Sequence, residues 1–171
     1  MKAGQSKQKG SSFERICCAK LSLWVSAGKR EDLFWRSAMS GGRATVAHAH
    51  GRSVRQFGDI CAVAPEGHAL TDRYVIECKH YKDLNIDSFL FSNTGQLAKF
   101  WKELLKVSEK ARLQPMLIAR QNRGPIFVML RRSIPVAAPL VTTMVTGVPT
   151  HLYLLNSLVT CEFASFLFNH R

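Results

Sequence analysis

Acidic residues are scarce in this chain of 171 residues, and its C-terminal part has almost no charge of either sign. Lys and Arg number 24 against 12 Asp and Glu, so the net charge is +12 at pH 7. From Ser133 onward only Glu162 and Arg171 are charged, and residues 1–132 therefore carry the whole excess. A basic surface of this size favours a polyanionic partner, with nucleic acid ahead of an anionic membrane, although any single lysine could simply be solvated.

The sequence also lacks the cysteine spacing of a zinc site. The cysteines are odd in number and two of them are adjacent: Cys17, Cys18, Cys61, Cys78 and Cys161. We therefore expect reduced and mostly packed thiols, as in a cytoplasmic or nucleoid-associated protein.

No segment has the long apolar run of a secretion signal or a membrane anchor. Residues 1–10 are polar and rich in lysine, so no signal peptide is expected. Proline and glycine interrupt the uncharged residues 133–161, so we expect no spanning helix and no membrane partner. Repeats and low-complexity tracts are absent as well. An apolar content of 46% with 21% charged residues indicates a globular domain with its own core.

Periodicity predicts an α/β domain with a mixed sheet. We expect a flexible basic N-terminus over residues 1–10 and a single domain over 11–171, made of a core (11–132) and a C-terminal apolar extension (133–171). The first helix should run from Ser11 to about Gly28, with Ser11 and Glu14 in a capping box. The later elements are a short strand (33–36), a hairpin (57–81), a helix (94–113), two strands (116–119 and 126–130), a short strand (151–155) and a helix (156–168).

The clearest chemical signal lies between Phe57 and Tyr81, where two β-rich runs flank a turn-like cluster. Asp59 begins the first run, and alternation along the second run places Glu77 and Lys79 on one face. Two carboxylates and a lysine at one end of a hairpin suit a hard divalent cation and the water beside it, and the Cys78 carbonyl could add a ligand. An ordinary ion pair explains the same residues without any catalysis.

A long loop is predicted over residues 37–56, because glycine, serine and arginine recur there without an apolar period. Loops of this length inside compact domains are usually functional or disordered. Arginine, serine and glycine-exposed amides are groups that hold phosphates, so the loop is a candidate for contact with nucleic acid.

These residues resemble the motif of the PD-(D/E)XK nucleases, since Gly58-Asp59 is followed by Val75-Ile76-Glu77-Cys78-Lys79. The wider order is similar to the archaeal-type Holliday junction resolvases, and the likeness covers about residues 10 to 132. Four further segments carry it: a glutamate-bearing first helix (Gly10-Ser11-Ser12-Phe13-Glu14-Arg15), an Arg/Ser/Gly loop (Arg36-Ser37-Ala38-Met39-Ser40-Gly41-Gly42), a glutamine-headed helix (Gly95-Gln96-Leu97) and the strand after it (115–119). Two features depart from the pattern: Gly58 stands where the motif name has proline, and the loop is long for a compact resolvase.

The resemblance implies a restriction-endonuclease-like core, in which helices flank a central mixed sheet. It implies a Mg²⁺-dependent endonuclease that cuts branched DNA as a homodimer, with Mn²⁺ able to substitute. Asp59, Glu77 and the Cys78 carbonyl would hold the metal, and Glu14 would join them as a further acid. Lys79 would orient or deprotonate the attacking water and offset negative charge. Expected DNA contacts are Arg36, Ser37, Ser40, Arg43, Arg55, Gln96 and Lys99.

Two alternatives remain open at this point. The first is a nicking, repair or restriction-type nuclease that acts on duplex DNA. The second is a nucleic-acid-binding module without catalysis, in which Asp59, Glu77 and Lys79 are merely paired.

Overall fold

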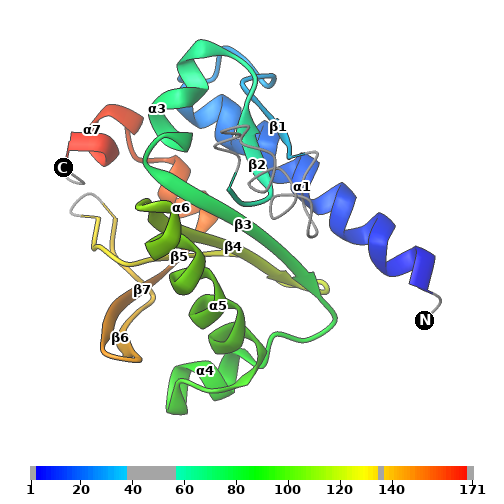
Figure 1. Ribbon diagram of the computed structural model, residues 1–171, viewed down its shortest axis with the longest axis vertical. Helices are drawn as coiled ribbons and strands as arrows, with labels where there is room; N and C mark the ends of the chain where they lie inside the picture. Colours follow the sequence, from blue (N-terminus) through cyan, green and yellow to red (C-terminus); the bar gives the residue numbers. More distant parts are fainter. Residues whose placement is uncertain (1–2, 38–56, 135–136, 169–171) are drawn as a thin grey trace.

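A five-stranded mixed sheet forms the centre of the molecule (Figure 1). The computed structural model describes residues 3–37, 57–134 and 137–168. The strand order is β3-β4-β5-β7-β6, and only β3 and β4 run parallel. The strands are β3 (Tyr74–Tyr81), β4 (Gln114–Gln121), β5 (Ile126–Leu130), β6 (Val141–Val145) and β7 (Val148–Leu154). The prediction of an α/β domain with a mixed sheet is confirmed.

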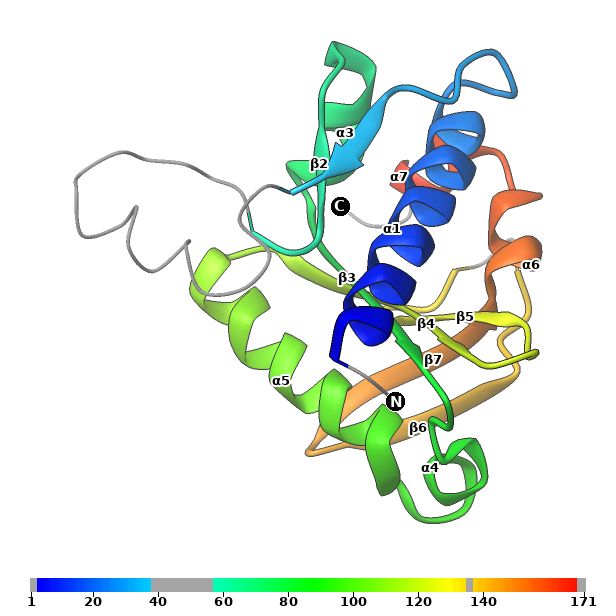
Figure 2. The same cartoon turned by 90° about the vertical axis from the view of Figure 1, so that its right-hand side faces the viewer.

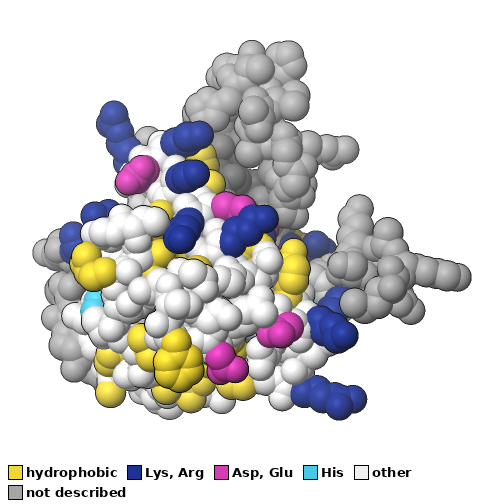
Figure 3. Space-filling view, turned by 90° about the horizontal axis from the view of Figure 1, so that it is seen from below, with side chains coloured by type: hydrophobic (Ala, Val, Ile, Leu, Met, Phe, Trp, Pro, Cys, Tyr) yellow, Lys and Arg dark blue, Asp and Glu magenta, His cyan; other side chains and the backbone are white. Residues whose placement is uncertain are grey.

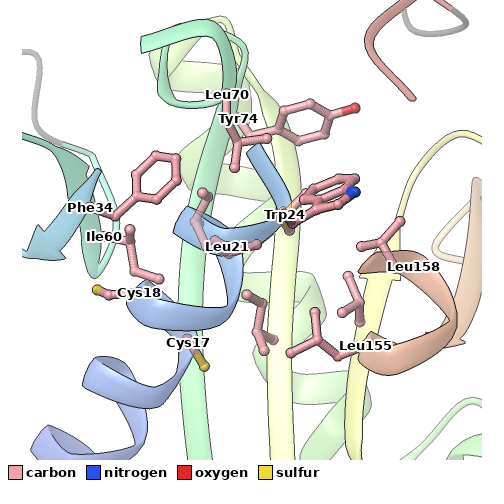
Figure 4. Packing of buried hydrophobic residues seen from close by; sticks show 14 of the residues in the cluster. Cys17, Cys18, Leu21, Trp24, Phe34, Ile60, Leu70, Tyr74, Leu155 and Leu158 are labelled. Carbon is pink, nitrogen blue, oxygen red and sulfur yellow. The ribbon is translucent and has the colours of Figure 1, made fainter. Parts of the chain in front are cut away.

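Helices cover both faces of this sheet (Figure 2). One face packs against α1 (Ala3–Val25), α6 (Leu155–Val159) and α7 (Phe163–Phe168), and the other against α4 (Ile86–Ser92) and α5 (Gly95–Ala111). Alternation along the strands supplies both cores, since Ile118 enters the α1 side and its neighbour Leu117 the α5 side. Figure 4 shows Leu21 and Trp24 of α1 within the first core. The described part of the chain contains no helix long and apolar enough to cross a membrane.

The predicted hairpin over residues 57–81 is wrong. β2 (Ile60–Ala62) pairs antiparallel with β1 (Phe34–Arg36), and it does not pair with β3. A 3-10 turn, η1 (Pro65–Gly67), and a short helix, α3 (His68–Thr71), fill the connection to β3. As a result of this connection, residue 58 lies beside Ile76 of β3 and forms a single parallel β-bridge with it. Parallel neighbours need such a crossover in place of a tight turn.

The first helix also differs from its prediction, because α1 begins at Ala3. Residues 3–10 are helical, so the expected flexible lead-in is wrong for this stretch, and Ser11 and Glu14 lie inside the helix without a capping box. Alanine, lysine and glutamine favour helix, and no proline interrupts them. The helix ends as predicted near Gly28, whose φ of 82° follows Ala27 at 51°.

The segment after Ser133 completes the sheet. β6 was not predicted, and it is joined to β7 by Thr146 and Gly147, which both have positive φ as a two-residue hairpin turn requires. The single helix predicted over 156–168 is two short helices, α6 and α7. The helix α4 follows β3, and its Phe89 is buried whereas Phe91 is exposed. The helix predicted over 94–113 is confirmed as α5.

Candidate active site

Backbone hydrogen bonds fix Asp59 beside the outer edge of β3. Its N–H donates to the carbonyl of Ile76 at 2.8 Å, and its carboxylate oxygen Oδ2 accepts from the N–H of Cys78 at 2.8 Å. Its own carbonyl accepts from the N–H of Ser37, also at 2.8 Å. The residue is 8% exposed. Asp59 therefore has a single position, set by the backbone of β3 on one side and by the end of β1 on the other.

Gly58 makes this close approach possible. Its φ is +86°, and a Cβ at this position would lie 2.4 Å from the carbonyl oxygen of Ile76. Proline, which the motif name has here, holds φ near −65° and cannot adopt this conformation. The departure from the motif that was noted in the sequence thus has a local geometric cause.

Glu77 and Lys79 project from β3 on the α5 side, as alternation predicted. The Lys79 ammonium contacts the Glu77 carboxylate, and its Nζ lies 5.6 Å from the ring centroid of Phe100 in α5. Burial by itself would lower the pKa of Lys79, but the carboxylates of Glu77 and Asp59 outweigh it and raise the pKa above its ordinary value. Lys79 is therefore protonated at neutral pH in the metal-free protein.

Glu14 projects from the middle of α1 and pairs with Arg36 at the end of β1. Its side chain is 13% exposed, and that of Arg36 is 28% exposed. The charge of Glu14 is the smallest of the contributions that raise the pKa of Asp59, and its place in a shared metal site stays a prediction. In this structure, however, the carboxylate of Glu14 is occupied by a guanidinium.

Burial and two neighbouring acids make ionisation of the Asp59 carboxyl unfavourable. Burial raises its pKa to about 7, and repulsion from Glu77 and, to a smaller extent, Glu14 adds to the effect. The Cys78 N–H and the Lys79 ammonium act in the opposite direction. A buried carboxylate next to other carboxylates is stabilised when a cation neutralises the group.

The donor set suits a hard divalent cation in part. Carboxylate and carbonyl oxygens are the ligands of Mg²⁺. The Cys78 N–H points toward Asp59, and the carbonyl of a strand residue points to the same edge as its N–H, so the Cys78 carbonyl also faces Asp59. Within the described ranges, no group of three or more His, Cys, Asp or Glu side chains is arranged to hold a metal ion. Asp59, Glu77 and the Cys78 carbonyl supply oxygens of the kind that Mg²⁺ takes, while the Glu77 carboxylate contacts Lys79 and the Glu14 carboxylate contacts Arg36.

The predicted DNA contacts are only partly brought to this site. Arg36 pairs with the carboxylate of Glu14. Ser37 is buried, and its N–H donates to the carbonyl of Asp59. Gln96 lies in the first turn of α5, one helical turn before Phe100, and Lys99 is exposed on the same helix. Three of the predicted contacts lie outside the described residues: Ser40, Arg43 and Arg55. Phe100, the aromatic partner of Lys79, was read from the sequence only as a core residue.

Comparison with known proteins identifies the family of this chain. Residues 5–166 match the family described as phage putative PDDEXK endonuclease. The chain belongs to this family. It is 34% identical over 108 residues to Protein D14 of Escherichia phage T5, an alignment that covers 62% of this chain and 66% of that protein. No solved structure matches.

Membership confirms the PD-(D/E)XK resemblance and agrees with the observed α/β fold. The family is described as one of phage putative endonucleases. The positions of Asp59 and of the Glu77-Cys78-Lys79 run fall inside the matched range.

A first prediction concerns Gly58. Gly58→Ala should lower the free energy of unfolding by roughly 2–4 kcal/mol, because it adds both a positive-φ penalty and a clash with the Ile76 carbonyl. Gly147→Ala is the matched control, since Gly147 has a φ of +77° but no atom within 4 Å of an added Cβ. Urea unfolding should give a clearly larger loss for Gly58→Ala, and equal losses would contradict the close approach.

A second prediction concerns the charge of Asp59. Its folded pKa is raised, so the metal-free protein should lose stability as pH rises from about 4, the unfolded pKa, to about 7. Asp59→Asn keeps an oxygen that can accept the Cys78 N–H and removes the charge. At pH 8 it should therefore stabilise the metal-free nuclease by on the order of 1–3 kcal/mol, with the gain vanishing near pH 4.

Thermal unfolding in EDTA across this pH range measures the effect. Asp72→Asn serves as control, because the Asp72 side chain is 74% exposed and its replacement should change stability little. A loss of stability at pH 8 in Asp59→Asn would contradict the assigned electrostatics.

Proposed function

We propose that this chain is a Mg²⁺-dependent endonuclease that hydrolyses phosphodiester bonds in branched DNA, with Mn²⁺ able to replace Mg²⁺. The observation that carries the proposal is the buried Asp59 carboxylate, which hydrogen bonds to the Cys78 N–H between Glu77 and Lys79 on β3. Such an acid is electrostatically unfavourable in the empty protein, and a divalent cation removes the penalty.

In this proposal Asp59, Glu77 and the Cys78 carbonyl hold the cation. When bound, the cation supplies an activated water and offsets the charge that develops on the phosphate. Lys79 would orient or deprotonate that water and offset developing negative charge. Glu77 orients Lys79 through their direct contact.

Arg36 links DNA binding to Glu14. Its guanidinium pairs with Glu14, yet it is also an expected phosphate contact at the start of the long loop. A guanidinium binds a phosphate as readily as a carboxylate. Transfer of Arg36 to the DNA backbone would free Glu14 to join the metal site, so that the full set of acids assembles only with substrate.

The preference for branched DNA and the homodimer rest on the resemblance to resolvases. Paired cuts in a four-way junction need two sites related by a two-fold axis. The second subunit would dock away from the site, at the opposite edge of the sheet. There β6 is the last strand, and residues 133–161 are uncharged. In Figure 3 hydrophobic side chains gather in the lower part of the face seen from below, whereas Lys and Arg side chains lie along its upper and right-hand sides. The alternative is a nuclease that nicks or cuts plain duplex.

The catalytic assignment is tested by Glu77→Gln and Lys79→Ala. Each should reduce Mg²⁺-dependent cleavage of labelled DNA by roughly 10²-fold or more, because the first removes a metal ligand and the second a positioned cation. Binding in EDTA should change little. Glu103→Gln, an exposed glutamate on α5, is the matched control. Cleavage at the parent rate in either variant would show that the assigned site is wrong.

Substrate shape is tested separately with the unchanged protein. A four-way junction and a linear duplex of the same sequence are cut in parallel under single-turnover conditions. The resolvase assignment predicts faster and paired cuts in the junction. Equal rates on the two substrates would favour the duplex nuclease.

A further inference from the structure

Three basic side chains gather beside the C-terminal half of β3, on the face that α1 covers. Lys9 extends from α1, His80 from β3 and Arg120 from β4, and His80 and Arg120 are direct partners in the parallel ladder. Phe13 of α1 packs on the His80 ring with a centroid distance of 5.2 Å. Lys9 contacts the side-chain oxygen of Asn122 in the turn after β4. Helix, strands and turn therefore hold the cluster in place.

The positive charge of this cluster has no acidic partner. Arg120 Nε donates to the carbonyl of Gly124 at 3.1 Å. In the described part of the chain, neither Lys9 nor Arg120 lies within ion-pair distance of a carboxylate. The cations of the candidate active site differ, since Lys79 is paired with an acid there.

The surface beside the cluster is hollowed and carries one more cation. Arg120 and Lys20 both line a hollow of about 280 Å³ between α1, the β4–β5 turn and the start of α6. Lys9, Phe13 and Lys20 are spaced so that they follow one side of α1. A strip of positive charge therefore extends along the helix from the cluster.

The cluster adjoins the candidate active site along the same strand. His80 follows Lys79 directly and lies about 10 Å from Glu77 along β3. β3 is the edge strand of the sheet, and α1 and α5 lie on its two sides (Figure 2). A DNA backbone that meets Glu77 on the α5 side and then crosses the C-terminal end of β3 would reach Lys9 and Arg120 on the α1 side.

We propose that Lys9, His80 and Arg120 form a binding site for a backbone phosphate of DNA at a distance from the phosphate that is cut. The proposal rests on the proposed function in that the ligand is the DNA substrate of the nuclease. The phosphate supplies the negative charge that the cluster lacks, and the guanidinium of Arg120 and the ammonium of Lys9 donate hydrogen bonds to it. This site on the α1 side would add to the DNA contacts that are predicted for α5 and for residues 37–56.

The salt dependence of DNA binding tests this site. Affinity of the full chain for a short fluorescein-labelled duplex is measured by anisotropy in EDTA, over about 50–200 mM salt. Lys9→Gln and Arg120→Gln should each reduce the slope of log affinity against log salt by about one, and weaken binding roughly 5- to 10-fold near 0.1 M salt. Arg120→Lys, which retains the charge, should keep the parent slope.

Lys29→Gln is the matched control. Lys29 is exposed beyond the other end of α1, about 30 Å from Lys9, and its loss removes the same charge. It should leave the slope unchanged. If all three glutamine variants lose the same slope, the effect is one of net charge alone. If Lys9→Gln and Arg120→Gln keep the parent slope, no phosphate binds at the cluster. Either result overturns the proposal. Because no metal and no cleavage step are present, the result does not depend on whether Glu77 and Lys79 catalyse.

Discussion

One hydrogen bond, from the backbone N–H of Cys78 to the carboxylate of Asp59, determines how the rest of the site is arranged. It holds the segment before β2 against the edge of β3 at a distance that only a glycine at position 58 permits. It also places a buried acid next to Glu77, and the pKa of Asp59 rises as a result. The protein thus keeps a buried acid whose ionised form is unfavourable, as expected where function sets the local structure.

Two basic side chains keep the remaining acids in place in the absence of a cation. Lys79 contacts Glu77 and Arg36 contacts Glu14, so each acid has a partner that a metal would have to replace or share. The two pairs differ in their surroundings. Lys79 lies against Phe100 on the α5 side, whereas Arg36 is the last residue of β1. This difference suits Lys79 to a fixed role in chemistry and Arg36 to an exchange between protein and substrate.

The fold class and the common face of Glu77 and Lys79 could be predicted from the sequence, because the alternation along β3 and the amphipathic period of α5 are local properties. It could not give the pairing of β2 with β1, since partner choice depends on the crossover through η1 and α3. The positive φ of Gly58 depends on its close approach to β3, which no local pattern encodes. The cluster of Lys9, His80 and Arg120 was missed for the same reason, because its members are far apart in sequence.

The central claim is that Asp59 and Glu77 bind a divalent cation at the edge of β3. Calorimetric titration of Mn²⁺ into the DNA-free protein near pH 6, in two buffers of different ionisation enthalpy, measures both the affinity and the protons released. The account predicts binding that releases protons, because Asp59 is largely protonated below about pH 7, and a loss of this binding in Glu77→Gln. Binding without proton release, or unchanged affinity in Glu77→Gln, would contradict it.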